Sequence, residues 1–160
     1  MVSAQSIVAA AYGLNGRVKY RHYDGGSIPM WLDDGIYGVP NPSYLAPNGV
    51  MGADLINFAL VKNGLPPNGG TGTFADYLVN TYPFDPSSPA QPGAIALRPY
   101  QGPQDDGSIA LYVGEHQLIQ SIPSEGVTDR YTDQQTYAWA SQGYPRYGFT
   151  IYGFLPGVSY

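Results

Sequence analysis

The hydrophobic pattern of this chain changes near Pro92-Gly93, and that change limits the folds open to it. Before this point, residues 53–63 carry apolar side chains at helical spacing, and Gly64 followed by two prolines ends the helix. After it, short apolar runs typical of strands cover 94–98, 108–113, 117–121 and 149–154. Helices followed by closely connected strands predict an α+β domain, with N-terminal helices packed on a mostly antiparallel sheet.

The remaining segments are expected to form short elements around this frame. Ser3 can cap a helix that ends at Gly13, and the weakly alternating stretch 17–23 is expected to be a short strand. We expect a second helix over 73–80, a helical turn over 131–141, and loops over 27–48 and 81–91. The 160 residues suffice for one domain of ordinary size, so 1–160 is predicted to be a single domain.

Charge and hydropathy exclude several classes of function. Seven Lys and Arg residues are spread singly along a chain of net charge -5, so no basic cluster is available to bind nucleic acid. No apolar run approaches the roughly 20 residues of a membrane span. The N-terminus has no basic flank or apolar stretch of the signal type, so we expect synthesis in the cytoplasm without a signal peptide.

Cysteine is absent and only two histidines are present, which leaves too few ligands for an ordinary zinc site. Asp33-Asp34 and Asp105-Asp106 are neighbouring carboxylates, and we interpret them as solvated turn formers rather than metal ligands. The segment 69–72 is rich in glycine but lacks the Lys-Ser/Thr of a phosphate-binding loop. We therefore expect neither a metal nor another cofactor.

Short motifs follow one another along the chain at a particular spacing. They are an aromatic turn at 20–26, the helix start Gly52-Ala53-Asp54, a Gly-rich segment at 69–73, PGAIALRPY at 92–100, GSIALYVG at 107–114, and LIQS at 118–121. In this order they resemble the NlpC-type cell-wall cysteine peptidases, most closely the branch in phage lysins and tail proteins of actinobacterial hosts. The resemblance covers residues 5–155 and implies a papain-like NlpC-type fold.

The same resemblance implies a catalytic triad whose positions are degenerate here. Such an enzyme needs a Cys at a helix N-terminus, a His on the neighbouring strand as general base, and a third polar side chain that orients the His. The matching positions are Gly52, Ser108 and Gln120, and Gln120 is expected to face the same way as Ser108. We expect His116 at a hairpin tip pointing to solvent, and His22 has no nucleophile beside it, so neither replaces the missing groups.

Each of the three degenerate positions also has a plain structural interpretation. Gly52 can be a tolerated glycine at a helix entry. Ser108 can be one polar position in a half-buried strand, and Gln120 can be a structural hydrogen-bonding group.

Candidate ligand-binding residues lie in the segments that would wall the implied cleft. Tyrosine offers a large flat face and a hydroxyl at small entropic cost, which suits binding surfaces. The same aromatic side chains can instead pack the loops of a domain rich in Gly and Pro. The candidates are Tyr20, His22, Tyr23, Trp31 and Asp54.

Three functions remain open at this point. The first is a catalytically inactive relative of phage peptidoglycan endopeptidases, serving as a binding or structural module of the virion or tail, with peptidoglycan or another virion protein as its partner. The alternative is an active-site-substituted form of a peptidoglycan cysteine endopeptidase that cleaves stem peptides. The third is a purely structural virion subunit, for which assembly as a homo-oligomer is plausible. All three place the chain in the virion or at the host cell wall.

Overall fold

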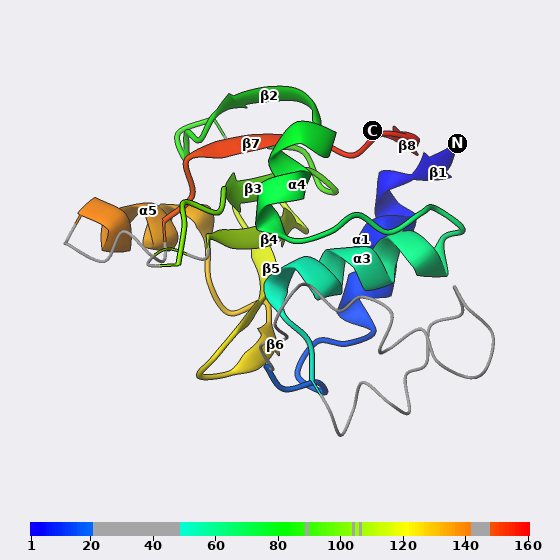
Figure 1. Cartoon of the computed structure of the whole chain (residues 1–160), viewed down its shortest axis with the longest axis horizontal. Helices are drawn as coiled ribbons and strands as arrows, with labels where there is room; N and C mark the ends of the chain where they lie inside the picture. The colour runs from blue at the N-terminus through cyan, green and yellow to red at the C-terminus, as the bar shows by residue number, and fades with distance from the viewer. Residues whose placement is uncertain (21–48, 89, 104, 106, 142–147) are drawn as a thin grey trace.

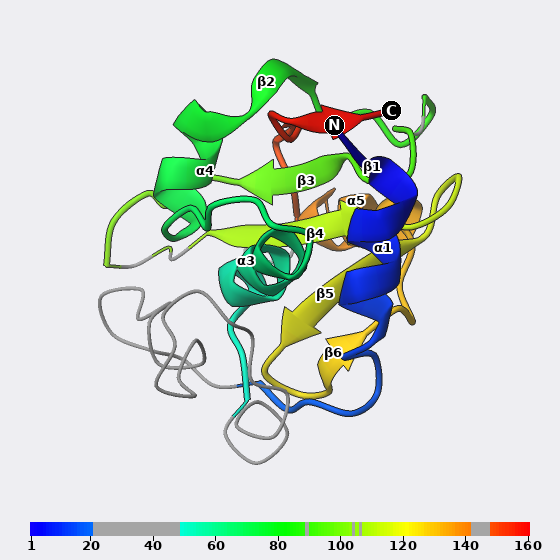
Figure 2. The same cartoon turned by 90° about the vertical axis from the view of Figure 1, so that its right-hand side faces the viewer.

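The protein, described by a computed structural model, is built on an antiparallel sheet with helices on both of its faces (Figures 1 and 2). The structure describes residues 1–20, 49–88, 90–103, 105, 107–141 and 148–160. Within these residues a six-stranded sheet has the order β2-β7-β3-β4-β5-β6. Its strands are β2 (Val79–Pro83), β3 (Ile95–Arg98), β4 (Ser108–Tyr112), β5 (Leu118–Ile122), β6 (Gly126–Thr128) and β7 (Ile151–Phe154). The predicted antiparallel sheet is confirmed.

The chain ends lie beside each other and form a separate small sheet. There β1 (Val2–Ser3) pairs in parallel with β8 (Val158–Ser159), as the adjacent N and C labels of Figure 2 illustrate. Helix α1 (Ala4–Tyr12) follows β1 directly, and its predicted cap is confirmed because Ser6 N donates to Ser3 Oγ at 3.1 Å.

The main core lies between the sheet and helices α1 and α3 (Gly52–Lys62). Alternate residues of the central strands point to this face, among them Leu97 of β3, Ile109 of β4 and Ile119 of β5. They pack with Ile7 of α1 and Leu55 of α3, and all five side chains are buried. The helix predicted from apolar spacing over 53–63 is therefore the one that fills the core.

A smaller core covers the opposite face of the sheet. It combines the small side chains of Ala94, Ala96 and Ala110 with the larger Tyr112 and Leu118. Helix α5 (Asp133–Ser141), the expected helical turn, lies on this side, behind the sheet in Figure 2. No helix within the described residues is long and apolar enough to cross a membrane.

Two sequence-based expectations are wrong. The helix expected over 73–80 is α4 (Thr71–Tyr77), and the residues after it form strand β2 instead of a helix end and loop. Pairing with β7 overrides the local sequence, and the strand bulges between Val79 and Tyr82, where Asn80 has φ 52°. The short strand expected over 17–23 is not formed over 17–20: Arg17 ends a turn, residues 18 and 19 are irregular, and Tyr20 makes an isolated bridge, while residues 21–23 lie outside the described part.

Candidate functional site

The N-terminus of α3 lies directly over strands β4 and β5. Gly52 is its first residue, following Met51 in extended conformation. A β-carbon added at Gly52 would lie 3.1 Å from Ile109 Cγ2, 3.4 Å from Ile109 O and 3.8 Å from Ser121 O. The β4–β5 ladder covers Leu111–Tyr112 and Leu118–Ile119 but not Ile109 and Ser121. The helix therefore begins above the point where the two strands are no longer paired.

The segment that leads into α3 is fixed by two hydrogen bonds. Val50 N donates to Lys19 O at 2.9 Å, and the buried Ser121 Oγ donates to Val50 O at 2.8 Å. Tyr20 forms a parallel bridge with Val50, so the predicted ligand residue Tyr20 lies close to the start of α3. Ser121 was not predicted as part of the site, although its position next to Gln120 places it on the helix-facing side of β5.

Ser108 and Gln120 share the other face of the sheet. Because Tyr112 pairs with Leu118, even-numbered residues of both strands point away from α3, and this agrees with the expectation that Gln120 faces the same way as Ser108. Ser108 is half-buried at the first position of β4, and Gln120 is only 6% exposed, opposite Thr128 of β6. Neither Gly52 nor Ser108 supplies the thiol or imidazole that the resemblance requires.

The remaining predicted ligand residues are placed only in part. Asp54 lies in the first turn of α3 and is 1% exposed, where an acidic side chain is favourable to the positive end of the helix dipole. Tyr20 is half-buried. His22, Tyr23 and Trp31 lie outside the described residues. A ligand-binding role for these five residues stays a prediction.

His116 does not point freely to solvent as expected. Its Nδ1 lies 2.9 Å from Asp133 Oδ1, and its side chain is 30% exposed. Asp133 is fully buried and accepts a second hydrogen bond from the Tyr112 hydroxyl at 3.0 Å. Burial, and then the nearby Asp133 carboxylate, hold the pKa of Tyr112 well above its usual value. The three side chains thus join the β4–β5 connection to the start of α5. This cluster lies at the Tyr112 end of β4, and Ser108 lies at the opposite end.

Of the four carboxylates considered as possible metal ligands, Asp105 lies in the described part of the chain. Asp105 accepts from Arg98 Nε at 2.9 Å and from Gly107 N at 3.1 Å, which fits its interpretation as a turn former. Asp33, Asp34 and Asp106 lie outside the described residues. Within the described part of the chain, no group of three His, Asp or Glu side chains is arranged to hold a metal ion.

The chain has the papain-like fold of NlpC type, as predicted. In it the N-terminus of a buried helix lies over the central strands of an antiparallel sheet. No protein-family model and no curated protein matches the sequence.

Two of the solved structures that this chain resembles illustrate the likeness. The peptidoglycan hydrolase RipB from Mycobacterium tuberculosis is 21% identical, with a TM-score of 0.50, and the match covers 78% of this chain and 58% of that one. A Staphylococcus aureus protein described as similar to lipoprotein, of the NLP/P60 family, is 13% identical, with a TM-score of 0.53 over 95% of this chain and 41% of that one. This chain therefore spans less than two thirds of either, and the likeness concerns the fold.

Proposed function

We propose that this chain is a catalytically inactive relative of phage peptidoglycan endopeptidases, acting as a binding or structural module of a virion or tail. The observation on which the proposal rests is Gly52 at the start of α3. It lies above Ile109, the residue that follows the degenerate position Ser108. Thiol catalysis needs a thiolate at this helix end and an imidazole beside it. A chain without cysteine cannot form that thiolate.

The retained architecture supports a binding role. Val50 is held by hydrogen bonds to Ser121 and Lys19, so the segment that enters α3 is fixed to the sheet. Peptidoglycan is the partner suggested by the fold, because RipB is a peptidoglycan hydrolase; another virion protein is the other partner we propose. The site of action would be the virion or the host cell wall.

One observation favours the alternative of an active-site-substituted endopeptidase that cleaves stem peptides. A β-carbon at Gly52 would lie 3.1 Å from Ile109 Cγ2 and 3.4 Å from Ile109 O, the next nearest atom. A cysteine at this position therefore needs the Ile109 side chain to shift by a few tenths of an ångström. In this reading the parent protein carries Cys at 52 and His at 108.

The test is an incubation of the purified protein with actinobacterial peptidoglycan, followed by assays of pelleting and of newly released amino groups. The proposal expects the protein to pellet without releasing amino groups. Release by the unmodified protein would overturn the proposal. If the protein neither pellets nor releases amino groups, peptidoglycan is excluded as the partner, and another virion protein remains.

A pair of variants separates the two readings of the site. Gly52→Cys with Ser108→His restores the two residue types at the matching positions, and Gly52→Ala with Ser108→His is the matched control without a thiol. Because residue 108 lies on the sheet face that points away from α3, activity would require the start of β4 to turn its side chain toward residue 52. Release of amino groups by the first variant alone shows that the surrounding site can still support peptidase chemistry and favours the active-site-substituted form. Inactivity of both favours long-standing loss of function.

A further inference from the structure

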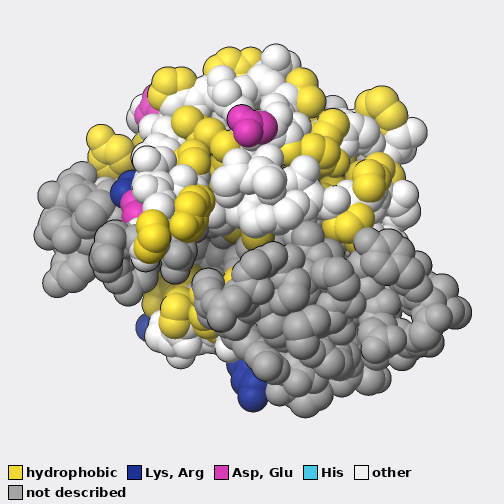
Figure 3. Space-filling model, viewed as in Figure 1, with side chains coloured by type: hydrophobic (Ala, Val, Ile, Leu, Met, Phe, Trp, Pro, Cys, Tyr) yellow, Lys and Arg dark blue, Asp and Glu magenta, His cyan; other side chains and the backbone are white. Residues whose placement is uncertain are grey.

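Four aromatic rings form a continuous surface at the β2–β7 edge of the sheet, which we call the aromatic strip: Tyr82, Tyr152, Phe154 and Tyr160. The Tyr82 and Tyr152 rings are stacked with centroids 5.4 Å apart and planes at 29°. Phe154 lies edge-on to Tyr152 at 6.3 Å and to Tyr160 at 4.8 Å. Hydrophobic side chains are visible along this upper rim, over β2, in Figure 3.

The rings are partly open yet fixed in place. Tyr82 is 45% exposed and Tyr160 is 42% exposed, while Tyr152 and Phe154 are half-buried against the smaller core. The Tyr160 hydroxyl donates to Gly93 O at 2.9 Å and accepts from Leu155 N at 2.8 Å. An aromatic ring held in this way loses little conformational freedom when a ligand covers it.

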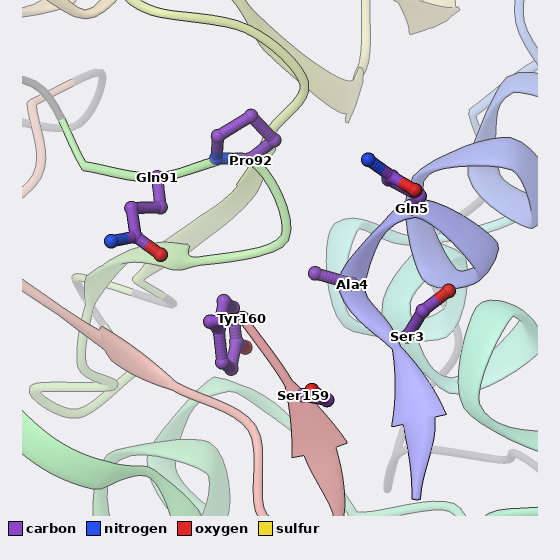
Figure 4. Close-up of a pocket in the computed structure, with 7 residues that line it drawn as sticks. All are labelled: Ser3, Ala4, Gln5, Gln91, Pro92, Ser159 and Tyr160. Atoms are coloured by element: carbon purple, nitrogen blue, oxygen red, sulfur yellow. The ribbon is translucent and has the colours of Figure 1, made fainter.

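Tyr160 also lines a shallow hollow of about 350 Å³ that continues the aromatic strip (Figure 4). The polar side chains around the hollow are Ser3, Gln5, Gln91 and Ser159, and all four are exposed. Within the described residues, the amides of Gln5 and Gln91 make no side-chain hydrogen bond. None of the side chains that form the aromatic strip or line the hollow is charged.

This chemistry suits a sugar polymer better than a protein surface. Four rings that are each more than half covered expose far less than the roughly 800 Å² per partner of a stable protein interface. Strand addition is also disfavoured, because the edge strand β2 has a bulge after Val79 and ends in Pro83, which has no N–H to donate. Pyranose rings, in contrast, stack their C–H faces on aromatic rings, and their hydroxyl and N-acetyl groups hydrogen-bond to side-chain amides.

We propose that the aromatic strip and the adjoining hollow bind an uncharged, N-acetylated polysaccharide chain. Sugar rings would stack on Tyr82 and Tyr160, and the amides of Gln5 and Gln91 would hydrogen-bond to the substituents. In its biological setting the proposal rests on the wall-binding function proposed above and names the glycan strand, rather than the stem peptide, as the bound part. The site lies at the β2–β7 edge, separated by β3 from the strands that carry Ile109 and Ser121.

The test measures binding to chito-oligosaccharides, which are soluble β-linked chains of N-acetylglucosamine, by calorimetry or by NMR titration. Tyr82→Ala and the pair Gln5→Ala with Gln91→Ala change exposed side chains, so the fold should persist; Tyr100→Ala, 50% exposed and outside the aromatic strip, is the matched control. Loss of one stacked ring should weaken binding about tenfold. The control should bind as the unmodified protein does.

The same variants are then assayed by pelleting with peptidoglycan, so that the two proposals fail separately. Oligosaccharide binding that is weakened by Tyr82→Ala but not by Tyr100→Ala supports the glycan site, even if the protein does not pellet with peptidoglycan and the wall-binding function fails. Pelleting with no oligosaccharide binding, or with equal oligosaccharide binding by all variants, overturns the glycan site and leaves the wall-binding function intact. Absence of both kinds of binding overturns both.

Discussion

Tyr112→Phe tests whether the buried Asp133 carboxylate depends on its hydrogen bonds. The substitution removes only the hydroxyl that donates to Asp133 Oδ2 at 3.0 Å and leaves a ring of nearly the same shape in the core. Because Asp133 is fully buried, water cannot replace that donor, and His116 Nδ1 at 2.9 Å remains. A lost hydrogen bond to a buried charged group costs about 1.5–3 kcal/mol. We expect the free energy of unfolding to fall by about 2 kcal/mol.

The measurement is equilibrium unfolding in urea at pH 7, with Tyr82→Phe as the matched control. Tyr82 is 45% exposed and its hydroxyl makes no hydrogen bond within the described residues, so its loss should change stability by less than about 0.5 kcal/mol. Equal stability of the two variants would refute the reasoning. It would mean that the Tyr112 hydroxyl contributes nothing to the position of Asp133.

The pH dependence gives a second readout of the same substitution. The pKa of Tyr112 in the folded protein is raised above its ordinary value of 10.0, because the folded state favours the neutral phenol. Its contribution to stability is therefore complete below pH 10 and is lost as the pH rises beyond that value. Burial raises the pKa of Tyr160 to about 12, so this residue adds to the same alkaline loss. Tyr112→Phe should make the decline above pH 10 shallower without abolishing it.

Three further substitutions probe the entry to α3 and the adjoining strands, each by urea unfolding. Ser121→Ala should lower the free energy of unfolding by about 0.5–1.5 kcal/mol, because it removes the buried hydrogen bond to Val50 O at 2.8 Å. Gly126→Ala should lower the free energy of unfolding by more than about 2 kcal/mol, because φ is 71° and the new β-carbon would overlap Val18 O. A decrease of less than about 1 kcal/mol would contradict this expectation. Gly52→Ala should change the free energy of unfolding by less than about 1 kcal/mol, because the one contact tighter than ordinary packing is to Ile109 Cγ2 at 3.1 Å, while alanine favours the helix over glycine.

Local pattern predicted the elements that carry the core. Helix α3 and strands β3, β4 and β5 lie within one or two residues of their predicted ranges, because each places buried apolar side chains at a regular period. Strand β2 could not be predicted in this way, since all five of its side chains are exposed and one is proline. Strand β2 forms because it pairs with β7. That pairing depends on the fold and cannot be inferred from residues 79–83 alone.

In the candidate site, too, features set by local sequence could be predicted and contacts between distant residues could not. The place of Gly52 at a helix start follows from local spacing, whereas the hydrogen bond from Ser121 to Val50 joins residues 71 positions apart. The same holds for Asp133, which meets Tyr112 and His116 only after the hairpin and α5 pack together. Side-chain networks of this kind depend on register, and a residue-type pattern carries no signal for them.

The start of α3 combines a glycine with a buried acidic side chain. In an NlpC-type enzyme the positive end of this helix would stabilise a thiolate at its first residue. Here the first residue has no side chain, and an acidic side chain, Asp54, stands in the first turn and is buried. The helix end is thus complemented by a residue that is only 1% exposed and cannot reach a polymer at the surface without rearrangement. Gly52 thus lies over Ile109 and Ser121 without a side chain of its own, and the aromatic strip is the binding surface that we propose.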